Sequence, residues 1–237
     1  MIDPKGRVVM VSGANRGIGA AVAKCLYNKG YIVSLGARDV LKIEALTVGW
    51  DPNRVLLSTY DARDESMAKN WVAQTVDRFG RLDGIVNNAA RYSDFTIEYG
   101  DLNDFDDVLA VNIKGPLLLL RSGMPHLRKT GQGRVVNVAS MSGKRVVGKH
   151  VAYAMSKFAL MALTAQTRSD GWDDGLRATA LCPGFVATDM AEPLTDRSLE
   201  TMTQPEELAE IAALAIALPN TASVPEFRIQ SFDEPMI

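Results

Sequence analysis

Short apolar runs alternate with longer amphipathic segments along most of the 237-residue chain. The apolar runs are rich in Val, Ile and Leu, which is typical of parallel strands that are covered on both faces. This pattern predicts seven strands, at residues 7–13, 31–38, 54–61, 82–90, 133–140, 177–184 and 226–230.

The amphipathic segments carry apolar residues at helical spacing. They predict helices at residues 17–30, 40–46, 65–79, 104–130 and 205–218, and a further helix that carries Tyr153 and Lys157. No internal repeat or linker interrupts the alternation. We therefore expect a single α/β domain over residues 1–237, a doubly wound Rossmann fold whose parallel sheet has helices on both faces.

The composition limits the kinds of partner that we expect this protein to bind. The net charge is −2, and 47% of the residues are hydrophobic. So small a net charge gives no field for holding nucleic acid or an anionic membrane, and the longest apolar run, residues 116–120, is too short to span a bilayer. Cys25 and Cys182 form no Cys-x-x-Cys pair and lie among apolar residues. We expect buried free thiols in a cytoplasmic protein, and no metal site.

The first predicted strand leads directly into "SGANRGIG", residues 12–19, which opens the first predicted helix. Glycines in such a turn let the backbone approach a pyrophosphate, toward which the amides of the helix N-terminus point. The position between a strand and a helix predicts a dinucleotide site. Its expected cofactor-binding residues are Gly13, Asn15, Arg16, Gly17, Ile18 and Gly19.

The second predicted strand ends at Arg38, without the acidic residue that would bind the ribose 2′-hydroxyl of NAD. Arg38 and Arg16 would instead bind a 2′-phosphate, because a guanidinium group offers two donors to a phosphate. Asp39 is placed to cap the following helix. NADP is therefore the expected cofactor, and NAD is the alternative.

Tyr153 and Lys157 are four residues apart, so they share one face of a helix. A Tyr-x-x-x-Lys pair arises readily by chance. The spacing by itself does not distinguish a surface pair from a proton-transfer site.

Taken together, these motifs resemble the short-chain dehydrogenase/reductase family along nearly the whole chain. Besides the glycine turn and "YAMSK" at residues 153–157, the chain has "NNAA" at 87–90, "AVNIKG" with Asn112, "VNVASMSG" with Ser140, and "CPGFVATDM" at 182–190. The motifs occur in the family's order, and Ser140 lies thirteen residues before Tyr153.

The resemblance implies a role for each matching residue. Asn112, Ser140, Tyr153 and Lys157 would form a catalytic tetrad. Tyr153 and Lys157 would also contact the cofactor, Lys157 at the nicotinamide ribose. The other implied cofactor residues are Asp61 and Ala62 at the adenine, Asn88 and Ala89 at the ribose, and Pro183, Gly184, Val186 and Thr188 near the carboxamide. A homo-oligomer, dimer or tetramer, is implied as well.

The chemistry agrees with these roles. Reduction of a carbonyl requires a hydride on carbon and a proton on oxygen, and a phenol with a pKa of ~10 is a poor base at neutral pH. We therefore expect the Lys157 ammonium and an oxidised nicotinamide to lower the pKa of Tyr153. Ser140 would donate a hydrogen bond to the substrate oxygen. Asn112 would hold a water that connects Lys157 to solvent.

Three features depart from the family pattern. Ala90 stands where the family more often has glycine, and the C-terminal segment lacks the family's aspartate-glycine-glycine ending. Residues 191–204, where the family has its substrate-covering loop, form a short segment. We therefore expect an open pocket, or one that a second subunit completes.

The sequence predicts an NADP-dependent oxidoreductase that transfers a hydride between the cofactor and a small carbonyl or alcohol, with Tyr153 as general acid/base. A non-catalytic NADP-sensing regulator is the alternative, whereas a nucleotide-sugar epimerase would need a C-terminal substrate domain. The substrate is expected to be neutral, because the positions that would face it are mainly apolar. These positions are 91–94, Met141, Ser142, Val146, Val147, His150 and 185–190.

Overall fold

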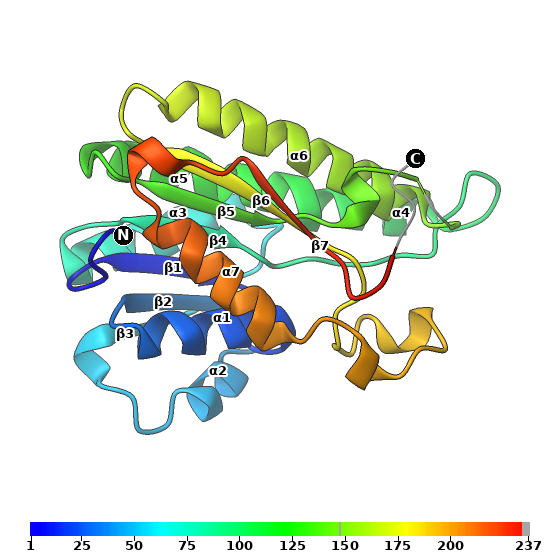
Figure 1. Ribbon diagram of the computed structural model, residues 1–237, viewed down its shortest axis with the longest axis horizontal. Helices are drawn as coiled ribbons and strands as arrows, with labels where there is room; N and C mark the ends of the chain where they lie inside the picture. The colour runs from blue at the N-terminus through cyan, green and yellow to red at the C-terminus, as the bar shows by residue number, and fades with distance from the viewer. Residues whose placement is uncertain (147, 234–237) are drawn as a thin grey trace.

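The structure, a computed structural model, describes residues 1–146 and 148–233. Within those residues, a parallel sheet has seven strands in the order β3-β2-β1-β4-β5-β6-β7 (Figure 1). The strands are β1 Val8–Ser12, β2 Ile32–Ala37, β3 Val55–Thr59, β4 Gly84–Asn87, β5 Arg134–Val138, β6 Arg177–Pro183 and β7 Glu226–Ile229. The prediction of a seven-stranded parallel sheet is confirmed.

Helices cover both faces of the sheet (Figure 1). One face is packed by α1 Gly17–Asn28, α2 Val40–Leu46 and α7 Pro205–Ala217. The other face is packed by α3 Glu65–Phe79, α5 Gly115–Lys129 and α6 Val151–Gly171. The short helix α4 Leu102–Leu109 precedes α5 and contacts α6. Among the described residues, none of the helices has both the length and the apolar character needed to cross a membrane.

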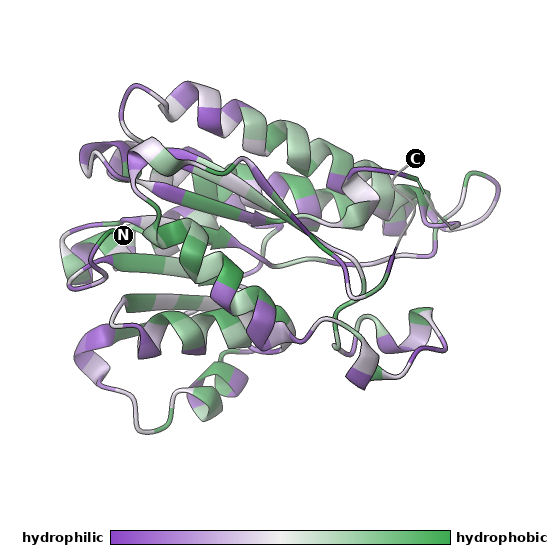
Figure 2. Ribbon diagram, viewed as in Figure 1, coloured by the Kyte–Doolittle hydropathy of each residue, from purple (hydrophilic) through white to green (hydrophobic). Residues whose placement is uncertain are grey.

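This double cover explains the near-continuous apolar strands. Every residue of β1, β4, β5 and β6 is buried, and Figure 2 shows hydrophobic residues gathered in the sheet and on the inward sides of the helices. A strand that is covered on both faces cannot place polar side chains toward solvent on alternate positions, so the alternation of a half-exposed strand is lost.

The order of the strands opens a crevice at one edge of the sheet. From β1 the chain proceeds outward to β2 and β3, and then returns to place β4 on the other side of β1. The loops after β1 and β4 therefore diverge, and in such sheets ligands bind at the carboxyl ends of the strands beside this reversal.

The predicted helix at residues 104–130 is not one regular helix. Helix α4 begins at Leu102 and ends at Leu109, a π-helical turn covers Ala110–Lys114, and α5 follows from Gly115. A π-turn accommodates an additional residue and redirects the side chains on it. The apolar spacing continues through this turn, so the sequence carries no periodic signal that marks it.

Candidate active site

A cavity of about 1330 Å³ lies along the carboxyl ends of the strands. Gly19 and Asn112, two of the predicted site residues, do not form part of its lining. The predicted residues that line it are Gly13, Asn15, Arg16, Gly17, Ile18, Arg38, Asp61, Ala62, Asn88, Ala89, Ser140, Tyr153, Lys157, Pro183, Gly184, Val186 and Thr188. The fold thus brings together residues from seven parts of the sequence.

The glycine turn has the backbone that the motif predicts. Gly13 and Gly17 adopt positive φ angles of 66° and 52°, where a side chain would be strained. A Cβ on Gly19 would lie 2.2 Å from the Gly13 carbonyl oxygen, so glycine is required there for packing rather than for ligand contact. Helix α1 starts at Gly17 without a side-chain cap and without an acidic residue in its first turn.

This uncapped helix end fits a dinucleotide. The first amides of a helix have no partner within the helix, and they are commonly satisfied by a side chain, water or an anion. Here they face a cavity large enough for a cofactor. Pyrophosphate oxygens would accept hydrogen bonds from these amides and gain from the positive end of the helix dipole.

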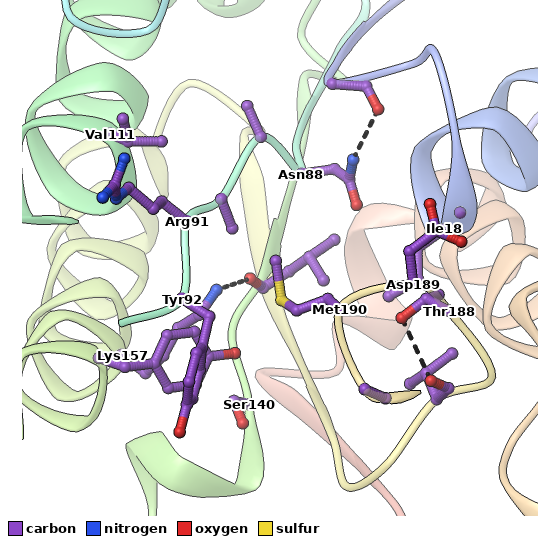
Figure 3. Close-up of a pocket in the computed structure, with 18 of the residues that line it drawn as sticks. Ile18, Asn88, Arg91, Tyr92, Val111, Ser140, Lys157, Thr188, Asp189 and Met190 are labelled. Atoms are coloured by element: carbon purple, nitrogen blue, oxygen red, sulfur yellow. Dashed lines mark hydrogen bonds between the residues drawn. The ribbon is translucent and has the colours of Figure 1, made fainter. Parts of the chain in front are cut away.

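Asn88 braces the turn from the opposite side. Its Nδ2 donates to the carbonyl oxygens of Ser12 and Gly13 at 3.0 and 3.1 Å. The Ser12 hydroxyl accepts hydrogen bonds from the amides of Asn88 and Ala89 at 3.0 and 3.1 Å. The side-chain amide of Asn88, a residue that the resemblance places at the ribose, therefore holds the glycine turn against β4, and Figure 3 shows its bond to the turn.

At the other end of the cavity, Asp61 follows β3. Arg63 donates to both of its carboxylate oxygens, at 3.0 and 2.6 Å, and these bonds lower the pKa of Asp61. Arg38 and Lys42 also line this end, and Lys42 lies 3.7 Å from the carboxylate of Asp39. Asp39 occupies the N-cap position of α2 as predicted, but its side chain makes no capping hydrogen bond.

Ser140, Tyr153 and Lys157 meet in the middle of the cavity. Ser140 follows β5, and its hydroxyl lies close enough to the Tyr153 phenol to act on the pKa of that group. Lys157 lies one turn after Tyr153 on α6, with Nζ 5.4 Å from the centre of the Tyr153 ring. Lys157 is 2% exposed, and its Nζ donates to the Val138 carbonyl oxygen at 2.8 Å. Figure 3 shows Ser140 and Lys157 among the side chains that line the cavity.

Burial dominates the acid–base behaviour of this group. It raises the pKa of Tyr153 to about 12, while the nearby Ser140 hydroxyl acts in the opposite direction. It lowers the pKa of Lys157 to about 8, because the ammonium loses its hydration. Without a bound cofactor, desolvation of the phenolate is the largest cause of the Tyr153 shift. The expectation that Lys157 and an oxidised nicotinamide together lower this pKa stays a prediction.

The Asn112 side chain is hydrogen-bonded to the backbone of the loop after β4. Its Oδ1 accepts from the Arg91 amide at 2.8 Å, and its Nδ2 donates to the Arg91 carbonyl oxygen and the Ser156 hydroxyl, both at 2.9 Å. Both amide hydrogens are thus engaged, which leaves no side-chain donor for the predicted water. The π-turn places Asn112 where it ties this loop to α6.

That loop supplies an aromatic wall beside Tyr153. The Tyr92 ring lies 5.2 Å from the Tyr153 ring and 5.8 Å from the His150 ring, between centroids. Arg91 and Ser93, on either side of Tyr92, both hydrogen-bond to Asp104. The hydrogen bonds of Arg91 and Ser93 to Asp104 hold Tyr92 in place. Burial lowers the pKa of His150, so this imidazole is neutral at pH 7.

The cavity is more charged than the sequence predicts. Arg145 and Lys149, which sequence reasoning did not select, line its substrate end together with Pro193 and Leu194. Val146 is 66% exposed and lies outside the lining, and Val147 lies outside the described residues. Single charged residues in a loop carry no periodic signal, so the sequence does not indicate that Arg145 and Lys149 line the cavity.

The prediction of two buried thiols is half correct. Both cysteines are free, but only Cys182 is fully buried. Cys25 is half-buried, and its Sγ lies 3.4 Å from a carboxylate oxygen of Glu210. Within the part of the chain that the structure describes, no cluster of three or more His, Cys, Asp or Glu side chains is arranged to hold a metal ion.

Comparison with known proteins identifies the family. Residues 7–199 match the family described as short chain dehydrogenase. The chain belongs to the short-chain dehydrogenase family. It is 40% identical over 228 residues to an agropine synthesis reductase of Rhizobium rhizogenes, covering 96% of this chain and 53% of that protein. The chain thus spans about half the length of this relative. It is also 30% identical to an uncharacterized oxidoreductase of Staphylococcus saprophyticus, covering 97% and 99% of the two chains.

Solved structures of short-chain dehydrogenases share the whole fold. An alcohol dehydrogenase from the archaeon Thermococcus sibiricus, complexed with 5-hydroxy-NADP, superposes with a TM-score of 0.87 at 26% identity, covering 97% of this chain and 98% of that one. Levodione reductase gives a TM-score of 0.85 at 26% identity, with coverage of 96% and 97%.

The C-terminal segment of this short-chain dehydrogenase packs against one residue of the cavity lining. The Phe232 ring stacks on Phe185, a lining residue, with centroids 6.4 Å apart. The Arg197 guanidinium lies 3.6 Å from the centre of the same Phe232 ring. Phe232 therefore joins the loop after β6 to the segment at residues 191–204, which the sequence describes as short.

Proposed function

We propose that this protein is an NADP-dependent oxidoreductase that transfers a hydride between the cofactor and a small carbonyl or alcohol, with Tyr153 as general acid/base. The observation that carries the proposal is the meeting of Ser140, Tyr153 and Lys157 inside a cavity large enough for a dinucleotide. Family membership supports it.

Each of the three residues has a distinct task. In the reducing direction the Tyr153 phenol gives its proton to the substrate oxygen, and burial keeps that proton in place at neutral pH. Ser140 donates a hydrogen bond to the same oxygen as negative charge develops on it. Lys157, fixed by the Val138 carbonyl, sits beside the phenol and holds the ribose. A bound nicotinamide supplies the hydride.

The preference for NADP rests on three cations of the cavity lining, Arg16, Arg38 and Lys42. A 2′-phosphate would draw on these donors, whereas a 2′-hydroxyl needs an acceptor such as a carboxylate. The alcohol dehydrogenase of similar fold, complexed with 5-hydroxy-NADP, supports this assignment.

The catalytic assignment is tested with Tyr153→Phe. This change removes the phenolic hydroxyl and retains the ring, so we expect turnover of a panel of aldehydes and ketones to fall by about 10²–10⁴-fold. NADPH binding, measured by fluorescence titration, is expected to stay within a factor of two to three. Wild-type turnover that the variant retains would remove Tyr153 from the proposal.

The cofactor assignment is tested by thermal stabilisation. A ligand that binds the folded state raises the melting temperature by mass action. We expect NADPH to raise it more than NADH does at equal concentration, and Arg38→Gln to reduce this difference. Equal shifts for the two cofactors would contradict the proposed role of the arginines.

A non-catalytic NADP sensor is the second candidate. It would bind NADPH with the same residues but would consume none with any carbonyl, and Tyr153→Phe would change nothing measurable. The meeting of Ser140 and Tyr153 favours the enzyme, since a sensor does not require a proton donor. The homo-oligomeric state and the cytoplasmic location stay predictions from the sequence.

A further inference from the structure

An ion pair spans the cofactor side of the cavity. Arg16 Nη1 lies 2.9 Å from Asp189 Oδ2, and both residues line the cavity. The two side chains are 63% and 76% exposed. They are 173 residues apart in the sequence, and in Figure 3 Asp189 and Thr188 lie beside Ile18 at the start of α1.

The backbone on each side sets up this contact. Arg16 is the N-cap of α1, inside the glycine turn. Thr188 precedes Asp189 and approaches the same turn so closely that a Cβ on Gly17 would lie 3.2 Å from its methyl group. Past Asp189, the Ala191 amide donates to the Thr188 carbonyl at 2.9 Å, and Thr203 bridges back to Val186. The ion pair therefore connects the glycine turn to the loop after β6, and each of these segments is fixed by other backbone contacts.

We propose that Asp189 is a specificity-determining residue, because its carboxylate competes with the 2′-phosphate of NADP for Arg16. This inference rests on the proposed NADP function. A guanidinium group presents a limited planar set of donors, and a carboxylate and a phosphate both seek the same paired donors. Asp189 thus weakens NADP binding relative to NAD binding, and Arg16 exchanges one anion for the other when NADP enters.

The two arginines of the cavity lining, Arg16 and Arg38, differ in their contacts. Arg38 lies near Asp61 and lowers the pKa of that carboxyl from a distance, without a direct hydrogen bond to it. Arg16 forms a direct contact at 2.9 Å that must open before the guanidinium can turn to a phosphate. The preference for NADP is accordingly adjustable at Asp189 without changing any residue that would touch the cofactor's phosphate.

The experiment is a cycle of four proteins titrated with NADPH and with NADH at one low salt concentration. They are the full-length wild type, Asp189→Asn, Arg16→Gln and the double variant. We expect Asp189→Asn to bind NADPH about threefold more tightly, a modest effect because exposed ion pairs are weak and screened by salt. NADH affinity is expected to stay within about 1.5-fold. In the Arg16→Gln background the Asp189→Asn change is expected to have no effect on either cofactor.

Glu192→Gln provides the matched control. Glu192 lies on the same loop, and its replacement removes the same charge, but it does not belong to the cavity lining. We expect its NADPH affinity to equal that of the wild type. A gain in this control as large as that in Asp189→Asn would assign the effect to net charge and overturn the inference. If the Asn variant does not fold, Asp189→Ser serves in its place with the same expectation.

The results of this cycle distinguish a failure of the proposed competition at Arg16 from a failure of the proposed NADP function. If the wild type prefers NADPH and Arg16→Gln removes that preference, but Asp189→Asn changes nothing, the competition is refuted while the proposed function stands. An equal gain for NADPH and NADH in Asp189→Asn would also refute it, because the 2′-phosphate would then play no part. If the wild type binds both cofactors equally and Arg16→Gln alters neither, the NADP assignment itself fails.

Discussion

At the scale of single residues, burial controls the site more strongly than nearby charge does. Lys157 and Tyr153 are neighbours on α6, and the simple expectation is that the ammonium stabilises the phenolate. Their pKa values move the other way, to about 8 and about 12, because each loses hydration on folding. Both groups thereby favour the neutral form. Tyr153 is held protonated, which suits its proposed role as general acid in reduction.

The Lys157 shift predicts a pH dependence of stability. Its pKa is lower in the folded protein than the 10.5 of the unfolded chain, so between those values the unfolded state binds more protons, and stability rises with pH. The contribution of this lysine is fully present above about 10.5 and is lost as the pH falls through about 8. In Lys157→Met this titration is absent. We expect the unfolding free energy of the wild type, relative to this variant, to rise between pH 8 and pH 10 in urea titrations. A difference that is flat or falls over that range would contradict the pKa direction.

At the scale of elements, the π-turn at Ala110–Lys114 organises the loop after β4. It places Asn112 between the Arg91 backbone and the Ser156 hydroxyl, and so connects α4, α6 and that loop. The aromatic wall at Tyr92 depends on this connection. The element that sequence reasoning treats as one uniform helix is thus the joint that positions part of the cavity.

Asn112→Ala tests this joint. Asn112 is 1% exposed, and its loss removes the partner of the part-buried Arg91 amide and carbonyl, while the Ser156 hydroxyl keeps its bond to the Tyr153 carbonyl. We expect this to cost about 1–3 kcal/mol of unfolding free energy. Chemical denaturation measures this change. The control is Asn103→Ala, since the Asn103 side chain makes an exposed bond to Asp101, and its loss is expected to cost less than about 0.5 kcal/mol. Equal effects of the two variants would refute the role of the π-turn.

At the scale of the whole molecule, distant parts of the chain close around one cavity. Phe185 follows β6, Arg197 lies in the segment at residues 191–204, and Phe232 comes after the last strand. Their rings and guanidinium group pack together. Of the three, only Phe185 lines the cavity, so Phe232 supports a residue of the pocket wall from behind.

Phe232→Ala tests this packing. The variant loses a ring stack and a cation–π contact, each worth ~0.5–1 kcal/mol. We expect KM for a carbonyl substrate to rise about three- to fivefold, because Phe185 and the 191–204 segment lose their common support. NADPH affinity is expected to be unchanged, since Phe232 lies away from the adenosine end. A parallel loss of NADPH binding would indicate a general structural effect instead.

The sequence by itself determined the fold class, the seven strands, the glycine turn and most of the predicted residues that gather at the cavity. These follow from local periodicity and from motifs of a few residues, both of which are properties of neighbouring positions. Only the tertiary structure decided the π-turn at Asn112, the upward shift of the Tyr153 pKa, the charged lining of the substrate end and the pairing of Arg16 with Asp189. Each of these depends on burial or on contacts between residues far apart in the sequence, and local patterns carry no information about either.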